Sequence, residues 1–124
     1  MKVIFNEQMF NQLNEQIKID TGKKIVVNDT AVYEVATDLG TLIIRGLQKR
    51  NSNSDEEVSE KAALIDKIIA NKNNPEAVEI TEAEKQHIDD FMRLQCTEIR
   101  ICYQEMLDRC NSEQEKVSAE NAGV

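Results

Sequence analysis

Residues 81–110 read TEAEKQHIDDFMRLQCTEIRICYQEMLDRC, a stretch that contains neither glycine nor proline. Its apolar residues recur at steps of three or four, close to the 3.6-residue period of an amphipathic helix. Thr81 and Glu84 have the spacing of a capping box at its start. The residues of the stripe are Ile88, Met92, Cys96, Ile99, Tyr103, Met106 and Cys110. This pattern predicts one long, unbroken helix.

Such a helix is longer than a chain of 124 residues needs to cover its core. It measures about 43 Å, whereas a compact domain of this size is about 35 Å across. The overhanging turns are still apolar, and a soluble monomer rarely leaves such a patch in water. We expect five residues of these turns to form a protein interface, most simply in a two-fold dimer: Ile99, Cys102, Tyr103, Met106 and Leu107. The alternative is an elongated monomer in which the other helices cover the stripe.

Three further helices are expected before residue 81. The first spans residues 7–18. The second spans residues 28–49, with a hairpin of residues 32–37 and 41–45 as its alternative, since Val, Tyr and Thr favour strands. The third spans residues 55–71 and carries acidic residues in its first turn, where the helix dipole favours negative charge.

Together these elements predict a mainly α fold, a small bundle of four helices with a long C-terminal helix. Short apolar clusters near residues 3–5, 25–27 and 78–80 leave room for a minor two- or three-stranded β element. Residues 1–110 are expected to form a single helical domain, since a chain of this length suits one hydrophobic core. Residues 111–124 are polar and are expected to form a disordered acidic tail.

Charge is divided unevenly along the chain. Residues 1–54 hold seven Lys and Arg against six Asp and Glu, whereas residues 55–124 hold eight against seventeen. We therefore expect no direct binding to nucleic acid, because the acidic half repels phosphate. An alternative function is an acidic nucleic-acid mimic that blocks a DNA-binding enzyme or regulator. Its acidic face consists of Asp55, Glu56, Glu57, Glu60, Glu82, Asp89 and Asp90.

The residue inventory does not favour an enzyme. His87 is the only histidine, and Cys96 lies about 13 Å from it along the predicted helix, too far for the hydrogen bond that activates a nucleophile. The spacing of the three cysteines lacks the close pairs of a zinc site, and the glycines match no phosphate-binding loop. We expect no catalytic residue, no metal ligand and no cofactor.

Apolar runs in this sequence are too short to cross a membrane, and the first residues lack the apolar segment of a signal peptide. We therefore expect a cytoplasmic protein with no membrane partner. The size and the polar linkers resemble those of small accessory proteins of bacteriophages and other mobile elements.

The overhanging helix favours a non-enzymatic protein–protein interaction module. We expect a small acidic helical oligomer that inhibits, recruits or chaperones another protein. A further alternative is a binding protein for a small anionic ligand, in which helix N-termini at Asn28 or Thr81 act together with Lys23 and Lys24.

Overall fold

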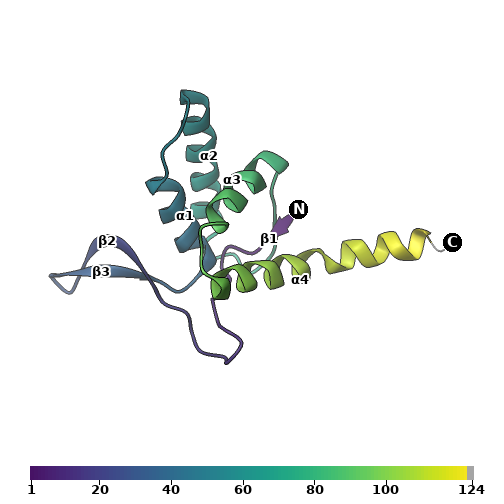
Figure 1. The fold of residues 1–124 in the computed structure, drawn as a ribbon, viewed down its shortest axis with the longest axis horizontal. Helices are drawn as coiled ribbons and strands as arrows, with labels where there is room; N and C mark the ends of the chain where they lie inside the picture. The colour runs from purple at the N-terminus through teal and green to yellow at the C-terminus, as the bar shows by residue number, and fades with distance from the viewer. Residues whose placement is uncertain (123–124) are drawn as a thin grey trace.

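The computed structural model describes the backbone of residues 1–122 and the side chains of residues 1–112. In chain order, its elements are β1 (Lys2–Val3), β2 (Ile19–Val27), β3 (Thr30–Ala36), α1 (Leu39–Lys49), α2 (Asp55–Asn71), β4 (Val78–Glu79), α3 (Glu82–Met92) and α4 (Thr97–Ala122). Helices α1, α2 and α3 lie on one side of α4, and the hairpin of β2 and β3 projects from the end opposite the C-terminus (Figure 1).

The fold is mixed α and β, so the predicted four-helix bundle is wrong. The strands form two separate antiparallel pairs, β1 with β4 and β2 with β3. Two of the three apolar clusters that left room for a β element do pair, with Val3 opposite Val78. The third cluster, residues 25–27, belongs to the projecting hairpin and not to that pair.

Residues 7–18 do not form the predicted helix but an irregular, turn-rich segment. The Asn11 side chain accepts hydrogen bonds from the amides of Leu13 (2.9 Å) and Glu15 (3.1 Å). Asn14 adopts a left-handed conformation with φ of 61°. Such bonds from asparagine to its own backbone compete with helix formation, and they explain why an apolar period alone did not produce a helix here.

The predicted helix 28–49 is helical only in its second half, as α1. The Asp38 carboxylate caps α1 by accepting a hydrogen bond from the Thr41 amide (2.9 Å). The first half is strand β3, in agreement with the strand preference of its Val and Tyr residues. The alternative hairpin is wrong as well, because its second strand, residues 41–45, lies inside α1.

Helix α2 has the predicted bounds. Ser54 caps it by accepting a hydrogen bond from the Glu57 amide (3.1 Å), and three acidic residues follow in the first turn. Its buried side chains are Lys61, Leu64 and Ile68. The Ser54 cap and the acidic first turn can both be recognised in the sequence, and the start of this helix was therefore predicted correctly.

The long helix predicted over residues 81–110 is broken into α3 and α4. The capping box at Thr81 is present. Helix α3 ends in a tight turn, in which the amides of Leu94 and Gln95 donate to the carbonyls of Phe91 (3.1 Å) and Met92 (3.0 Å). No glycine or proline marks this break. The turn lets both halves of the apolar stripe pack on one body, which a straight rod of that length could not do.

The core lies between the four helices and the N-terminal segment, and α2 contributes Leu64 and Ile68. Five members of the stripe, Ile88, Met92, Ile99, Tyr103 and Met106, are each at most 5% exposed. The chain itself therefore covers these side chains, and they do not form the outward-facing apolar surface that was expected.

The backbone of α4 continues to Ala122. The predicted division into a domain, 1–110, and a disordered acidic tail, 111–124, falls mostly on residues 113–124. The side chains of these residues lie outside the described part of the chain, and the division stays a prediction.

Candidate functional site

The residues predicted to form an interface lie inside the chain's own core. They are Ile99, Cys102, Tyr103, Met106 and Leu107, and none is more than 8% exposed. The Tyr103 hydroxyl donates to the Asp89 carboxylate (2.9 Å), and the Cys102 thiol donates to the carbonyl of Phe10 (2.9 Å). Burial raises the pKa of Tyr103, and the charge of Asp89 raises it further. These side chains hold α4 against the body, so an interface has to use other residues.

The predicted acidic face is divided between α2 and α3, and four of its seven residues have partners within the chain. The contacts are Glu57 with Lys61 (2.9 Å), Glu60 with His87 (2.9 Å), Asp89 with Lys85 (2.6 Å) and Asp90 with Arg93 (3.1 Å). The others, Asp55, Glu56 and Glu82, lie in the first turns of the two helices. Much of this negative charge thus stabilises the fold, through ion pairs or at helix N-termini. None of the described contacts gives separate support to a nucleic-acid mimic.

The positions considered for an anionic ligand do not form a site. Asn28 lies in the hairpin turn and not at a helix start. At Thr81 the capping box occupies both the hydroxyl and the amide, each bonded to Glu84. Among the described residues, no group of three or more His, Cys, Asp or Glu side chains is placed to hold a metal ion.

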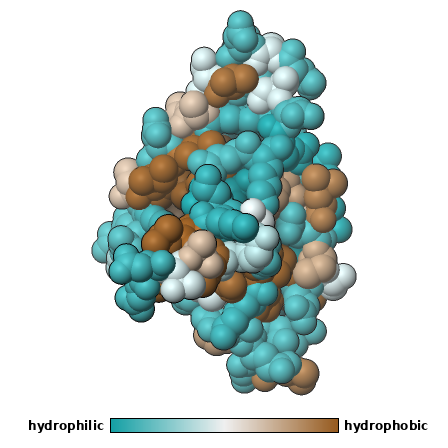
Figure 2. All heavy atoms as spheres, turned by 90° about the vertical axis from the view of Figure 1, so that its left-hand side faces the viewer, coloured by the Kyte–Doolittle hydropathy of each residue, from teal (hydrophilic) through white to brown (hydrophobic). Residues whose placement is uncertain are grey.

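The hairpin of β2 and β3 is where exposed apolar side chains gather. They are Val26, Val27, Val32, Tyr33 and Val35, which range from 39% to 74% exposed. Figure 2 views the molecule from the hairpin's side and shows hydrophobic surface around the hydrophilic region nearest the viewer. Apolar side chains grouped in this way on a protein surface mark an interaction site more often than single ones do.

The hairpin turn consists of two residues, Asn28 and Asp29, with φ of 50° and 63°. Positive φ at both positions defines a type I′ turn, whose twist matches that of the flanking strands. The strands pair in register from Val27 opposite Thr30 to Lys24 opposite Tyr33. The turn therefore fixes which side chains share a face of the hairpin.

The two faces of the hairpin differ in what covers them. The inner face includes Thr21, Glu34 and Ala36 and rests on the body at the hairpin's base, where Ala36 is 1% exposed. The outer face, defined by the opposite alternation, turns away from that contact. Its residues are Asp20, Lys24, Val26, Ala31, Tyr33 and Val35, and every one of them is exposed. The Lys24 ammonium lies 5.4 Å from the centre of the Tyr33 ring and flanks this apolar surface with a positive charge.

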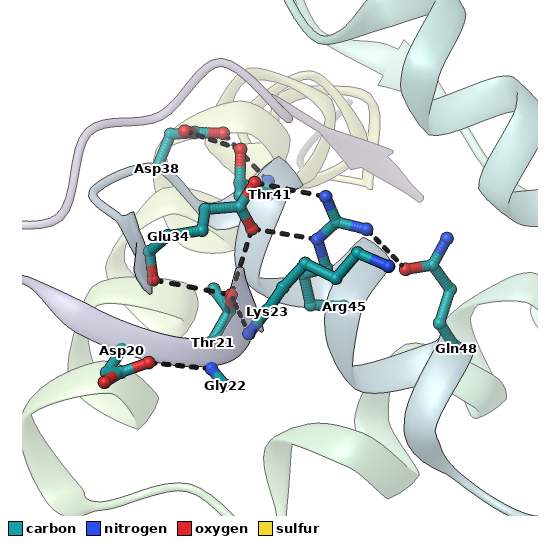
Figure 3. A network of polar contacts seen from close by, with 9 residues as sticks. All are labelled: Asp20, Thr21, Gly22, Lys23, Glu34, Asp38, Thr41, Arg45 and Gln48. Carbon is teal, nitrogen blue, oxygen red and sulfur yellow. Dashed lines mark hydrogen bonds and ion pairs between the residues drawn. The ribbon is translucent and has the colours of Figure 1, made fainter. Parts of the chain in front are cut away.

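A polar network fixes the base of the hairpin to α1 (Figure 3). The Arg45 guanidinium donates to both carboxylate oxygens of Glu34 (2.8 and 3.1 Å), and the Thr21 hydroxyl donates to the same carboxylate (3.0 Å). Arg45 also donates to Gln48 within α1 (2.9 Å). A bidentate pair of this kind sets orientation as well as distance. The hairpin is thus held at its base while its distal half has no cover.

The Arg45 hydrogen bonds lower the pKa of Glu34, and the Thr21 hydroxyl adds to this against the opposing effect of partial burial. The hydrogen bond with Glu34 in turn raises the pKa of Arg45. Glu34 is therefore ionised at neutral pH. At that pH the ion pair between Glu34 and Arg45, the anchor of the hairpin, is fully formed.

Sequence reasoning missed this site although a signal for it exists. Asn28 and Asp29 stand between two runs rich in β-branched residues, the pattern of a two-residue hairpin turn. The same two residue types are also among the preferred helix N-caps, and that interpretation led to a helix starting at Asn28.

No protein-family model, no curated protein and no solved structure matches this chain. Within the described residues, none of the helices combines the length and the apolar character needed to cross a membrane. Function has to be inferred from the geometry of the chain itself.

Proposed function

We propose that this chain is a cytoplasmic, non-enzymatic protein-binding module that engages another protein through the outer face of its β2–β3 hairpin. The partner is inhibited, recruited or chaperoned by this contact. The observation that supports the proposal is the exposure of Val26, Tyr33 and Val35 on one face of a projecting hairpin whose base is fixed.

The residue chemistry of this face suits a protein surface. Val, Ala and Tyr offer apolar area with few rotamers to order, so little conformational entropy is lost when they become buried. The anchor at Glu34 and Arg45 reduces that loss further, because the hairpin is held before it meets a partner. Lys24 and Asp20 supply one charge of each sign beside the apolar residues and can select the orientation of the partner.

The proposal is tested by capturing proteins from host cells with three forms of the chain. The first is the natural sequence, and the second carries Val26→Thr together with Val35→Thr, which keeps the strand-favouring shape and makes the face polar. The third is a matched control on α2, Val58→Thr with Ile69→Thr, whose residues are similarly exposed. Bound proteins are quantified by mass spectrometry.

We expect at least one protein to be retained by the natural chain and by the α2 control but depleted about tenfold or more by the hairpin variant, the loss of roughly 1.4 kcal/mol of binding. Two results contradict the proposal. One is an identical set of retained proteins for all three forms. The other is an equal loss from the α2 control, which would place the contact on α2.

A further inference from the structure

The two edges of the hairpin are protected to different degrees. Strand β2 has a register shift between Asp20 and Lys24, with Gly22 at φ of 76°. It also carries adjacent lysines, Lys23 and Lys24. Bulges and lysines are the features by which proteins keep an edge strand from pairing. Strand β3 has neither, since its seven residues run without interruption and its one charged side chain, Glu34, is held by Arg45.

The turn determines which backbone groups of β3 face outward. In a two-residue type I′ hairpin the residues that flank the turn, Val27 and Thr30, exchange hydrogen bonds with each other. Alternation along the strand then directs the amides and carbonyls of Ala31, Tyr33 and Val35 away from β2. The Glu34 carbonyl confirms this phase, because it accepts from the Thr21 hydroxyl on the β2 side (3.4 Å).

These outward groups have no backbone partner in the described part of the chain, where β2 and β3 form a sheet of two strands. A hairpin of two strands is only marginally stable in water without further cover. The open edge of β3 therefore has the properties of a template for one more strand.

We propose that β3 pairs edge to edge with β3 of a second copy of this chain, antiparallel and centred on Tyr33. In this register Tyr33 lies opposite Tyr33 of the other copy, and Ala31 lies opposite Val35. All three outward-facing residues of each copy are paired, which gives about six hydrogen bonds between the copies. The two hairpins become one four-stranded sheet.

A second copy is the occupant because β3 is complementary to itself in this register. The overlap covers the whole strand, Thr30–Ala36, and every opposing pair on the outer face is apolar or aromatic, which favours cross-strand packing. Glu34 lies opposite Val32 and not opposite its own copy. A shift of the centre to Glu34 would place two carboxylates against each other, and a shift to Val32 would shorten the overlap. A two-fold arrangement pairs the open β3 edges of both copies at once. The outer edges of the resulting sheet are then the two β2 strands, which carry the register shift and the lysines.

This contact uses the backbone edge of the hairpin, whereas the proposed function uses side chains of its outer face. Pairing would bring the two outer faces side by side and extend the apolar surface that they offer. Each inference can nevertheless stand without the other, and different variants test them.

Amide hydrogen exchange measured by NMR on the full chain, from low micromolar to millimolar concentration, tests the pairing. We expect the amides of Ala31, Tyr33 and Val35 to exchange at least tenfold more slowly at high concentration, together with the appearance of a dimer in sedimentation. Added salt should strengthen the dimer, because each copy has a formal net charge of −8. A chain that stays monomeric throughout, with these three amides unprotected, overturns the proposal.

Ala31→Pro removes one outward donor per copy while the amides that bond β2 remain, and proline is tolerated at such edge positions. We expect it to weaken the dimer about thirtyfold, since two ordinary hydrogen bonds are lost. Ala31→Ser, which keeps the amide, should leave the dimer unchanged. Protected amides at Val27 and Thr30 show that the hairpin of the Ala31→Pro variant is still folded. If the dimer of such a folded variant is not weakened, it forms through another surface, and this result contradicts the pairing. Val26→Thr alone changes only β2 and leaves every residue of the β3 contact in place. It should weaken capture of the protein partner but still form the dimer, so failure of the proposed function and failure of the pairing can be told apart.

Discussion

The helical body and the projecting hairpin contain similar apolar residues, but only the body covers them. In the body, the stripe of α3 and α4 is buried because the chain turns back after Met92. The exposed apolar residues that remain there, such as Val58, Ile69 and Leu94, lie apart in the sequence. In the hairpin, five apolar side chains within ten residues of the sequence, 26–35, stay exposed.

The two regions differ in how well an apolar sequence pattern predicts a surface that binds a partner. A helical stripe is ambiguous, because a short turn can fold the helix back onto its own core. A two-stranded hairpin has no such option, since one face can rest on the body while the other has to face water or another molecule. In this chain the apolar side chains that stay exposed as a group are those of the hairpin and not those of the helical stripe.

The largest contrast between the two regions should come from placing the same charge in each. Met106→Glu buries a carboxylate where Met106 is fully covered, and we expect it to lower the free energy of unfolding by about 4 kcal/mol or more. Val26→Glu places the same side chain on the exposed outer face, with an expected change within about 1 kcal/mol. Urea unfolding followed by far-ultraviolet circular dichroism measures both.

If Met106→Glu were to keep its stability and only change the oligomeric state, α4 would present its stripe outward after all. A large loss from Val26→Glu in a monomeric sample would mean that the outer face packs on the body. Either result would remove the contrast between body and hairpin.

Much of the body was predictable because local chemistry and burial agree there. The Ser54 cap, the acidic first turn of α2 and the Thr81 capping box all act within a few residues of their helix. The stripe of residues 88–106 marked an apolar face, which the chain itself buries except at Cys96, and not the outward-facing surface expected of its second half. The break after Met92 was not predictable, since no helix-breaking residue marks it and only packing of the whole chain requires it.

The hairpin was less predictable because its signals have two meanings. Asn28 and Asp29 suit a helix cap and a type I′ turn equally well, and only the pairing of β2 with β3 decides between them. Apolar residues on both faces of a strand usually indicate that it is buried in a sheet. Which face stays exposed depends on the anchor between Glu34 and Arg45, which joins residues eleven positions apart.

The anchor itself can be tested by comparing Glu34→Gln with the natural chain across pH. The pKa of Glu34 is lowered from its ordinary value of 4.5, chiefly by the Arg45 hydrogen bond. Its contribution to stability is therefore complete above pH 4.5 and is lost as the pH falls through the lowered pKa. We expect Glu34→Gln to reduce the free energy of unfolding by about 1 kcal/mol at pH 7. This difference between the variant and the natural chain, the stability gap, should disappear in acid.

Chemical denaturation at several pH values gives this gap, and amide exchange of β3 shows whether the hairpin loosens with it. Asp20→Asn, which removes an exposed carboxylate outside this ion pair, is the matched control. A gap that stays constant from pH 7 into acid would show that the Glu34 charge does not hold the hairpin. Equal behaviour of the two variants would show the same.

The smallest expected effect lies at the tip of the hairpin, far from the anchor. Asp29 adopts φ of 63°, a left-handed conformation that costs a residue with a Cβ atom more than it costs glycine. Asp29→Gly creates the Asn-Gly pair that type I′ turns favour, and we expect it to stabilise the hairpin by about 0.5 kcal/mol. Asp29→Ala removes the same charge but keeps the Cβ atom, so it should destabilise the hairpin by a similar amount. The exchange rates of the Val27 and Thr30 amides report both changes. If the two variants shift those rates in the same direction, the charge of Asp29 and not its conformation controls the turn, and the type I′ geometry that sets the two faces of the hairpin loses its support.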